Sequence, residues 1–346
     1  MALPIQFRRQ MAIQRADADR LSQRRAAADL VRWTQPLPRG PAVRYGAALT
    51  RLQREINVLT FAALKPFIQV ETAARQDALE PMDPTSTLLT QITKAVAKLL
   101  SPSALRTIIT PAGESVTAWN GRKYDNALGD VLAINDVPAN RIGTMFESWT
   151  TENVALIQGS NQEQINKIRA LMFRAQRQGQ RASDTENQIR LIMESTTQRA
   201  RLIARDQTTK FNGQLDRLKQ TNAGITGYVW RTSQDERVRP SHRDLNGKHF
   251  DWDKPPAVGA PGQDIQCRCV AEPDVGALLG DKRSGERPNA SAFQAITPAT
   301  RAAARRRHAA TIKAEQGSVQ AARDRVNAAR RERAAARREL TALAGG

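Results

Sequence analysis

Two of the chain's three histidines and both of its cysteines lie in one short stretch, residues 242–269. His242 and His249 occur in "SHRDLNGKHF", and Cys267 and Cys269 occur in "QCRCV". Imidazole nitrogens and thiolate sulfurs are common ligands of zinc in proteins. These residue types are therefore those of a zinc site with mixed ligands, although a single residue between two thiolates gives a narrower bite than the usual spacing.

The same residues also fit the interior of a small folded unit without a metal, and this interpretation is the favoured one. The histidine and cysteines would then pack its core, while Asp235, Arg237 and Arg268 would pair to hold its turns. In either case we expect the histidine and the two cysteines to meet in space. Cysteines this close would form a strained ring, so they indicate no disulfide framework and favour an intracellular, reducing origin.

The stretch "SHRDLNGKHF" is superficially similar to the His–Asn motif of metal-dependent nucleases, in which a histidine activates water beside a divalent cation. No third histidine or carboxylate follows at a suitable spacing, because His308 lies in the basic C-terminal segment. The sequence also offers no Ser-His-Asp triad, Gly-rich nucleotide loop or paired-carboxylate pattern. We therefore assign no catalytic residue and expect a protein that is not an enzyme, with a nuclease as the weakest alternative.

The composition is strongly basic, with 53 Lys and Arg against 34 Asp and Glu and a net charge of +19 over 346 residues. Such a chain associates with polyanions, because neutralising phosphates releases counterions. The alternative is that the charge belongs to loosely structured tails without a specific nucleic-acid site. No apolar run approaches the roughly 18 residues of a membrane span, and no secretory signal is recognisable. We expect a soluble protein made in the cytoplasm.

The elements that must position these residues are predicted to be mainly helical. Residues 1–45 are predicted as a basic N-terminal arm and residues 46–150 as a helical region. Apolar residues at helical spacing predict a helix over 45–70 that Pro66 should end or kink. A short helix is predicted over 87–100, and the segment 103–145 is ambiguous, with "TPAGES" and "NALGD" as turn signals.

The segment 151–275 is predicted as a distinct module, a helical hairpin followed by a small α+β unit. A loop is expected at Gly159-Ser160, and helices are expected over 161–178, 182–197 and 197–222. After residue 224 the helical spacing of apolar residues ends, and segments rich in aromatic and β-branched residues follow. "TGYVWRTS", "KHFDW" and "IQCRCVAEPDV" are predicted as short strands, "RPSHRDL" as one helical turn entered through Pro240, and Asn246-Gly247 as a tight turn.

The order of these elements carries a set of motifs. In chain order the motifs are Leu202–Arg205, a strand ending near Trp230, Asp235 with Arg237, then Pro240, His242, Leu245 and Gly247, and finally Cys267-Arg268-Cys269. Residues 150–275 thereby resemble the C-terminal domain of phage head morphogenesis proteins of the Mu protein F-like type. The motif residues Asp235, Arg237, Pro240, Leu245, Gly247 and Arg268 are expected to have structural roles.

One departure from the family bears on the metal hypothesis. Many members carry C-P-x-C where this chain has Arg239-Pro240-Ser241-His242, so a site of four thiolates is excluded here. A mixed zinc site would instead use His242, Cys267 and Cys269, with His249 or Asp235 as a fourth group.

The resemblance implies a minor structural protein of a tailed-phage head, incorporated during procapsid assembly. Its implied partners are the portal protein, the major capsid protein and the packaged double-stranded DNA, with a homo-oligomer as a further expectation. Its implied location is the virion, in the capsid interior or at the portal vertex, after assembly in the host cytoplasm. The alternative is a DNA-binding protein that acts through its Arg-rich tail.

The Arg/Ala-rich segment 276–346 lies outside the resemblance. It has strong helix formers but few large apolar residues, so it cannot bury enough surface to offset its own ordering entropy. It is predicted to be a disordered basic tail or a helix that forms on a partner. The candidate nucleic-acid contacts are Arg305, Arg306, Arg307, Arg330, Arg331, Arg333, Arg337 and Arg338.

Overall fold

The computed structural model describes residues 37–73, 83–128, 137–274 and 327–343. The described chain is mainly helical with one small antiparallel sheet, as predicted. It forms two compact units. Within the described ranges, the helical unit comprises residues 38–73, 83–117, 140–211 and 327–343, and the sheet-bearing unit comprises residues 37, 118–128, 137–139 and 212–274.

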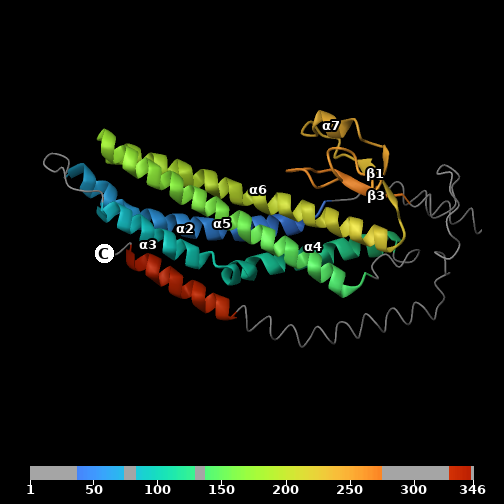
Figure 1. Ribbon diagram of the computed structural model, residues 1–346, viewed down its shortest axis with the longest axis horizontal. Helices are drawn as coiled ribbons and strands as arrows, with labels where there is room; N and C mark the ends of the chain where they lie inside the picture. The colour runs from blue at the N-terminus through green and yellow to red at the C-terminus, as the bar shows by residue number, and fades with distance from the viewer. Residues whose placement is uncertain (1–36, 74–82, 129–136, 275–326, 344–346) are drawn as a thin grey trace, which may run out of the picture. The chain divides into compact units, whose positions relative to one another are not determined.

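Long amphipathic helices build the helical unit. They are α2 (Arg39–Ala73), α3 (Asp83–Leu99), the first part of α4 (Pro102–Leu128), α5 (Ala139–Gln178), most of α6 (Ala182–Asn222) and a tail helix over residues 327–343. Helices α5 and α6 form an antiparallel hairpin and lie side by side (Figure 1). The hairpin turns at Gly179, whose φ of +63° is the left-handed conformation that ends many helices.

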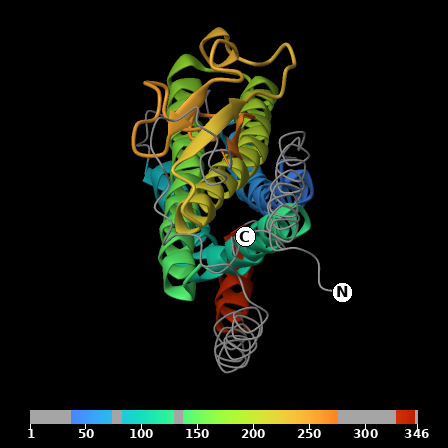
Figure 2. The same ribbon diagram turned by 90° about the vertical axis from the view of Figure 1, so that its right-hand side faces the viewer.

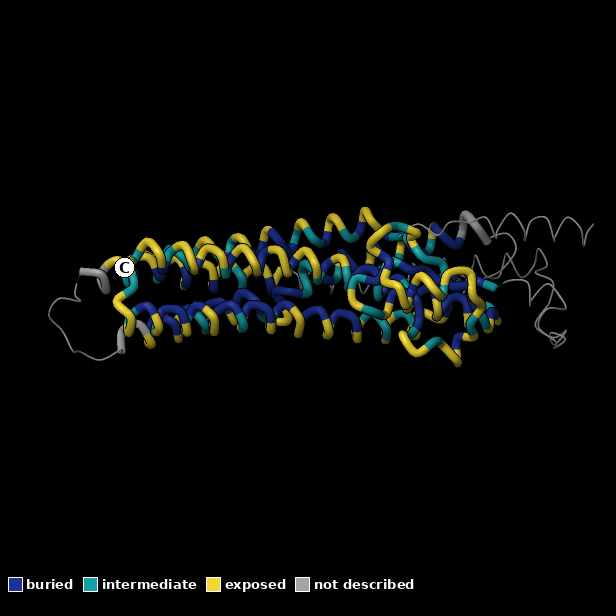
Figure 3. The backbone as a smooth tube through the Cα atoms, turned by 90° about the horizontal axis from the view of Figure 1, so that it is seen from above, coloured by how far each residue is buried: buried dark blue, intermediate teal, exposed yellow. Residues whose placement is uncertain are grey.

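Buried and exposed residues alternate along these helices at each turn (Figure 3). This is the pattern of helices that bury one face against their neighbours. No helix in the described ranges is both long enough and apolar enough to cross a membrane.

The helix predicted over 45–70 is longer than expected, since α2 starts at Arg39, inside the segment predicted as an arm, and continues through Pro66. Pro66 therefore does not end the helix. Its ring lies on the exposed face, while Leu64 and Ile68 on either side are buried. The burial of these neighbours offsets the backbone hydrogen bond that proline removes. Residues 1–36 lie outside the described residues.

The loop predicted at Gly159-Ser160 is also wrong, because α5 runs through both residues. Ile157, Ser160 and Ile165 are buried along one face of α5, and this packing overrides the weak helix propensity of a single glycine. The two helices predicted over 182–222 are one helix, α6.

The ambiguous segment 103–145 contains α4 and the start of α5, and "TPAGES" is helical rather than a turn. Gly113 permits close packing. A Cβ at this position would lie 2.6 Å from the ring of Phe146 and 2.7 Å from that of Trp149. The glycine in "TPAGES" therefore allows α4 and α5 to approach closely and does not mark a turn.

The sheet-bearing unit contains three short strands, as predicted. They are β1 (Gly227–Arg231), β2 (His249–Asp251) and β3 (Val270–Pro273), in the antiparallel order β2-β1-β3. The single turn α7 (Pro240–Arg243) lies between β1 and β2. The third strand is shorter than the predicted segment "IQCRCVAEPDV", and Cys267 and Cys269 lie just before it. Gln266 has a φ of +58°, which interrupts extended backbone.

The sheet packs against the C-terminal turns of α6 (Figure 2). Gln220 of α6 makes the joining contacts. Its Nε2 donates to the carbonyl of Ala271 and to the hydroxyl of Tyr124, both at 3.0 Å, and its Oε1 accepts from Trp252 Nε1 at 3.2 Å. One buried amide thus fixes helices and sheet together.

Candidate functional site

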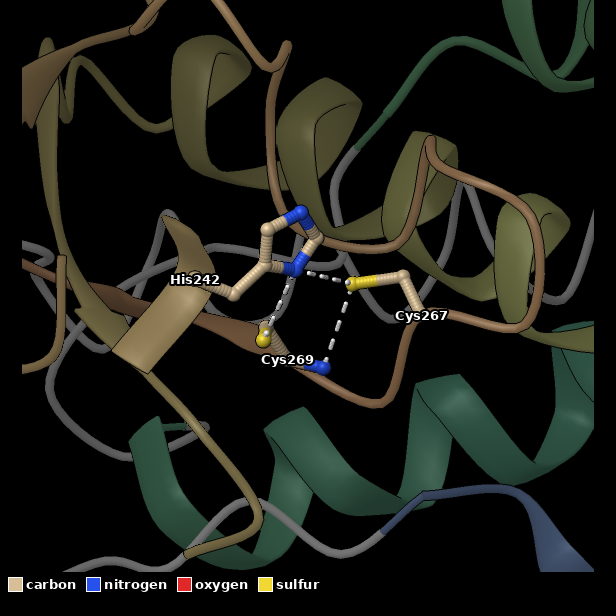
Figure 4. Close-up of side chains that lie close together, drawn as sticks. All are labelled: His242, Cys267 and Cys269. Carbon is tan, nitrogen blue, oxygen red and sulfur yellow. Dashed lines mark hydrogen bonds between the residues drawn. The ribbon is translucent and has the colours of Figure 1, made fainter. Parts of the chain in front are cut away.

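The structure brings His242, Cys267 and Cys269 together in the core of the sheet-bearing unit. His242 Nδ1 lies 3.6 Å from the sulfur of each cysteine, and the three ligand atoms all lie within 4.8 Å of one another (Figure 4). The residues are 2%, 3% and 4% exposed, and both cysteines are free thiols. We call this group the His-Cys-Cys cluster.

The histidine is positioned by α7, the shortest helix among the described residues. Pro240 occupies the first turn of α7, and its ring favours the extended conformation of Arg239, whose ψ is 145°. The His242 amide donates to the Arg239 carbonyl at 3.0 Å. On the sheet side, the ring of Trp230 meets the imidazole edge-on, with 5.3 Å between ring centroids. The local turn and the strand together aim Nδ1 at the two sulfurs.

The other imidazole nitrogen faces an acidic residue. His242 Nε2 lies 3.4 Å from Asp264 Oδ2, and Asp264 also pairs with Arg239 at 2.9 Å. Nε2 is buried and makes no well-formed hydrogen bond within the described residues. Asp264 is therefore placed to orient the ring and to favour a proton on Nε2.

The two thiols have different electrostatic surroundings. A hydrogen bond from the Cys269 side chain lowers the pKa of Cys267 to about 6 although burial opposes this shift. The Cys269 amide also donates to Cys267 Sγ at 3.4 Å. The same contact with Cys267, together with burial, raises the pKa of Cys269.

The second candidate histidine is not part of the cluster. His249 lies on β2 with its side chain exposed, and its Nδ1 is 3.0 Å from Asp274 Oδ2. Asp235, the other candidate for a fourth ligand, forms a two-point ion pair with the guanidinium of Arg268. Neither residue belongs to the group of ligand atoms around His242.

The remaining motif residues make local structural contacts. The Arg237 amide donates to Asp235 Oδ1 at 3.0 Å, and Leu245 packs against the core of the sheet. Gly247 has a φ of +81°, and its amide donates to the Trp230 carbonyl at 2.8 Å. A side chain would strain this backbone conformation, so the turn requires glycine.

The tail arginines divide into three groups. Arg305, Arg306 and Arg307 lie outside the described residues. Arg333 and Arg337 pair with Glu55 of α2 at 3.0 and 3.2 Å. Arg330, Arg331 and Arg338 are exposed, and Arg337 is exposed as well although it pairs with Glu55.

The tail helix packs on the chain's own helical unit. It buries Ala329, Ala336 and Leu340, and its Glu339 pairs with Lys98 of α3 at 2.6 Å. The tail helix has few apolar residues and was predicted to need a partner. Over residues 327–343 the rest of the chain is that partner.

A basic groove that was not predicted from the sequence lies between α2 and α6. It has a volume of about 650 Å³, and small residues form much of its lining, among them Ala42, Gly46, Ala47 and Thr50. Its arginines are Arg51, Arg54, Arg201 and Arg205, and no ion pair among the described residues involves them. Spacings of three and four residues place each pair on one helix face, which is the signal that could have indicated the groove. We call this feature the arginine groove.

Residues 166–272 match the family model described as phage Mu protein F like protein. The segment is thus similar to this family, and we call it the Mu F-like domain. The domain starts within α5 and ends in β3, so it contains the His-Cys-Cys cluster and all the motif residues. The match agrees with the resemblance recognised in the sequence, and the family is one of phage head morphogenesis proteins.

One curated protein is also similar to part of the chain. The chain is 37% identical over 125 residues to an uncharacterized protein of Haemophilus influenzae. The match covers 36% of this chain and 28% of that protein. No solved structure matches the chain. The tail helix and α2 to α4 lie outside the family match.

Proposed function

We propose that this chain is a minor structural protein of a tailed-phage head, built into the procapsid and in contact with the portal and the packaged DNA. The observation that carries the proposal is the Mu F-like domain over residues 166–272. The relatives cover only part of the chain, so the function of the whole protein rests on what this domain contributes.

A non-enzymatic role agrees with the positions of the polar residues in "SHRDLNGKHF". His242 is buried against two cysteines, His249 is paired with Asp274, and Asn246 Oδ1 accepts from the Thr232 amide at 3.0 Å. Each of the three therefore has a structural partner, which supports the choice of a structural protein over a metal-dependent nuclease.

Particle composition tests the head assignment. DNase-treated phage particles and procapsids from a packaging-defective background would be analysed by quantitative mass spectrometry. We expect a small number of copies in both, because incorporation during assembly precedes packaging. Absence from both particles would reject the proposal. Presence only in filled particles would reject incorporation before packaging.

We infer that the contact with DNA uses the arginine groove more than the tail. Four guanidinium groups around a shallow groove give a concentrated positive site, whereas Arg333 and Arg337 of the tail are engaged by Glu55. DNA phosphates bind such arginines with release of counterions, so binding should weaken steeply with salt.

The groove is tested by replacing its four arginines with alanine and measuring affinity for duplex DNA over a range of salt concentrations. Each lost phosphate contact lowers the salt slope by about 0.9, so the slope should fall by up to about three to four. The comparison variant replaces Arg330, Arg331 and Arg338. A loss of slope in this variant but not in the groove variant would assign the contact to the tail, as in the alternative of a tail-driven DNA-binding protein.

A further inference from the structure

We propose that His242, Cys267 and Cys269 bind one Zn²⁺ ion as a tetrahedral site with three protein ligands. A water molecule or another small ligand would take the fourth position. The inference rests on the geometry of the His-Cys-Cys cluster and is independent of the proposed head function.

The two nitrogen-to-sulfur separations in the cluster fit a tetrahedral zinc ion. Zinc lies about 2.0 Å from imidazole nitrogen and about 2.3 Å from thiolate sulfur, so a tetrahedral angle puts nitrogen and sulfur roughly 3.5 Å apart. The observed separations from His242 Nδ1 are 3.6 Å to Cys267 Sγ and 3.6 Å to Cys269 Sγ. Side chains from α7 and from the segment before β3 converge on one point, as Figure 4 shows.

The ligand chemistry selects among metals. Two thiolates and one imidazole suit zinc and other borderline or soft ions, whereas Mg²⁺ and Ca²⁺ prefer oxygen. Two thiolates would also neutralise the double charge of the ion. This balance matters because the three ligand residues are almost fully buried, and an unbalanced buried charge is costly.

The surroundings of the cluster resemble those of a metal-binding histidine. Such a histidine usually gives its second nitrogen to a carboxylate, which fixes the tautomer and the ring. Here Asp264 Oδ2 faces His242 Nε2 at 3.4 Å, on the side opposite the sulfurs. The Cys269 amide points at Cys267 Sγ, which stabilises a thiolate. Asp264 thus acts as a positioning residue.

A metal would supply stability that the small sheet needs. Its strands have five, three and four residues, and small units with short strands often depend on metals or disulfides. The ion would join α7 to the segment before β3. Its ligands His242 and Cys267 are 25 residues apart in the sequence. It would therefore hold the loops that cover the sheet core.

The test uses the full-length protein, purified under reducing conditions without chelator and analysed for metals. We expect one zinc per chain, and loss of most of it in His242→Ala, Cys267→Ser and Cys269→Ser. The matched control is His249→Ala, which removes the exposed histidine of the same unit and should keep the zinc. A His308→Ala variant tests binding by the histidine outside the described residues.

Cobalt substitution gives a readout that does not depend on the variants folding. Co²⁺ added to the metal-free wild-type protein should produce sulfur-to-metal charge-transfer bands and the intense visible bands of tetrahedral coordination. A wild-type protein that retains no zinc after reconstitution and desalting, and shows no such bands, would overturn the proposal. Zinc retained by a folded Cys267→Ser/Cys269→Ser variant would identify an adventitious ion only and would also overturn it.

Discussion

Lys123 Nζ lies 2.6 Å from Asp216 Oδ1, and both side chains are only 2% exposed. This ion pair joins α4 to α6 inside the sheet-bearing unit. Asn120 Nδ2 also donates to Asp216 Oδ1 at 2.7 Å, and the Lys123 ammonium lies 4.6 Å from the centre of the Tyr124 ring. Burial lowers the pKa of Lys123, while Asp216 opposes the shift. Asp216 therefore supplies the negative charge that compensates the buried ammonium group.

Removing the acid should therefore leave an uncompensated buried charge. We expect Asp216→Ala to lower the free energy of unfolding by about 3–5 kcal/mol, measured by urea denaturation. The control is Arg106→Ala, which breaks an exposed pair with Glu147 and should cost about 1 kcal/mol or less. Equal effects of the two variants would contradict a buried pair at Asp216.

Gly113 should not tolerate a methyl group. A Cβ here would meet the Phe146 and Trp149 rings at 2.6 and 2.7 Å, so Gly113→Ala should destabilise the helical unit by roughly 1–3 kcal/mol. Gly159→Ala is the matched control, because its Cβ would meet nothing within 4 Å and alanine is the better helix former. Thermal denaturation should show a lower Tm for the first variant and an equal or higher Tm for the second.

Glu272 should make stability depend on pH. Burial raises the pKa of this carboxyl from its ordinary value of 4.5, and Arg231, which pairs with it, opposes the shift, as does His249, while Asp274 adds to it. The folded protein then holds a proton that the unfolded chain has lost. Stability should fall as pH rises from about 4.5 through the raised folded pKa.

The pH effect is checked by urea denaturation across that window in wild type and in Glu272→Gln. The variant lacks the titrating group, so its stability should change less with pH over the same interval. The ion pair with Arg231 is also lost, which changes the absolute stability but not this comparison of slopes. Parallel pH profiles for the two proteins would show that Glu272 does not carry the effect.

The His-Cys-Cys cluster should matter for stability with or without an ion. His242→Ala and Cys267→Ala remove buried side chains and should cost roughly 1–3 kcal/mol, the usual range for such changes. A chelator should lower the Tm of the wild type toward that of these variants only if a metal is bound. Unchanged melting temperatures in both variants would contradict a structural role for the cluster.

Most of the sheet-bearing module could be predicted from the sequence. The strand around Trp230, the helical turn entered at Pro240 and the tight turn at Gly247 all follow from local chemistry, namely aromatic and β-branched residues, a fixed proline φ and a glycine φ of +81°. The meeting of His242 with the two cysteines was likewise expected from the rarity and spacing of these residues. Signals that act over a few residues survive folding because tertiary contacts reinforce them.

The continuation of the helices, the pairing of the charges and the choice of histidine in the cluster depend on contacts between distant parts of the chain. Pro66 and Gly159 looked like breaks, yet burial of neighbouring residues keeps both helices intact. Arg333 looked available to DNA, yet it pairs with Glu55, far away in sequence. His249 has the same chemistry as His242 but faces solvent. Long-range burial and pairing set these outcomes, and a single sequence records no distance between segments that meet only after folding.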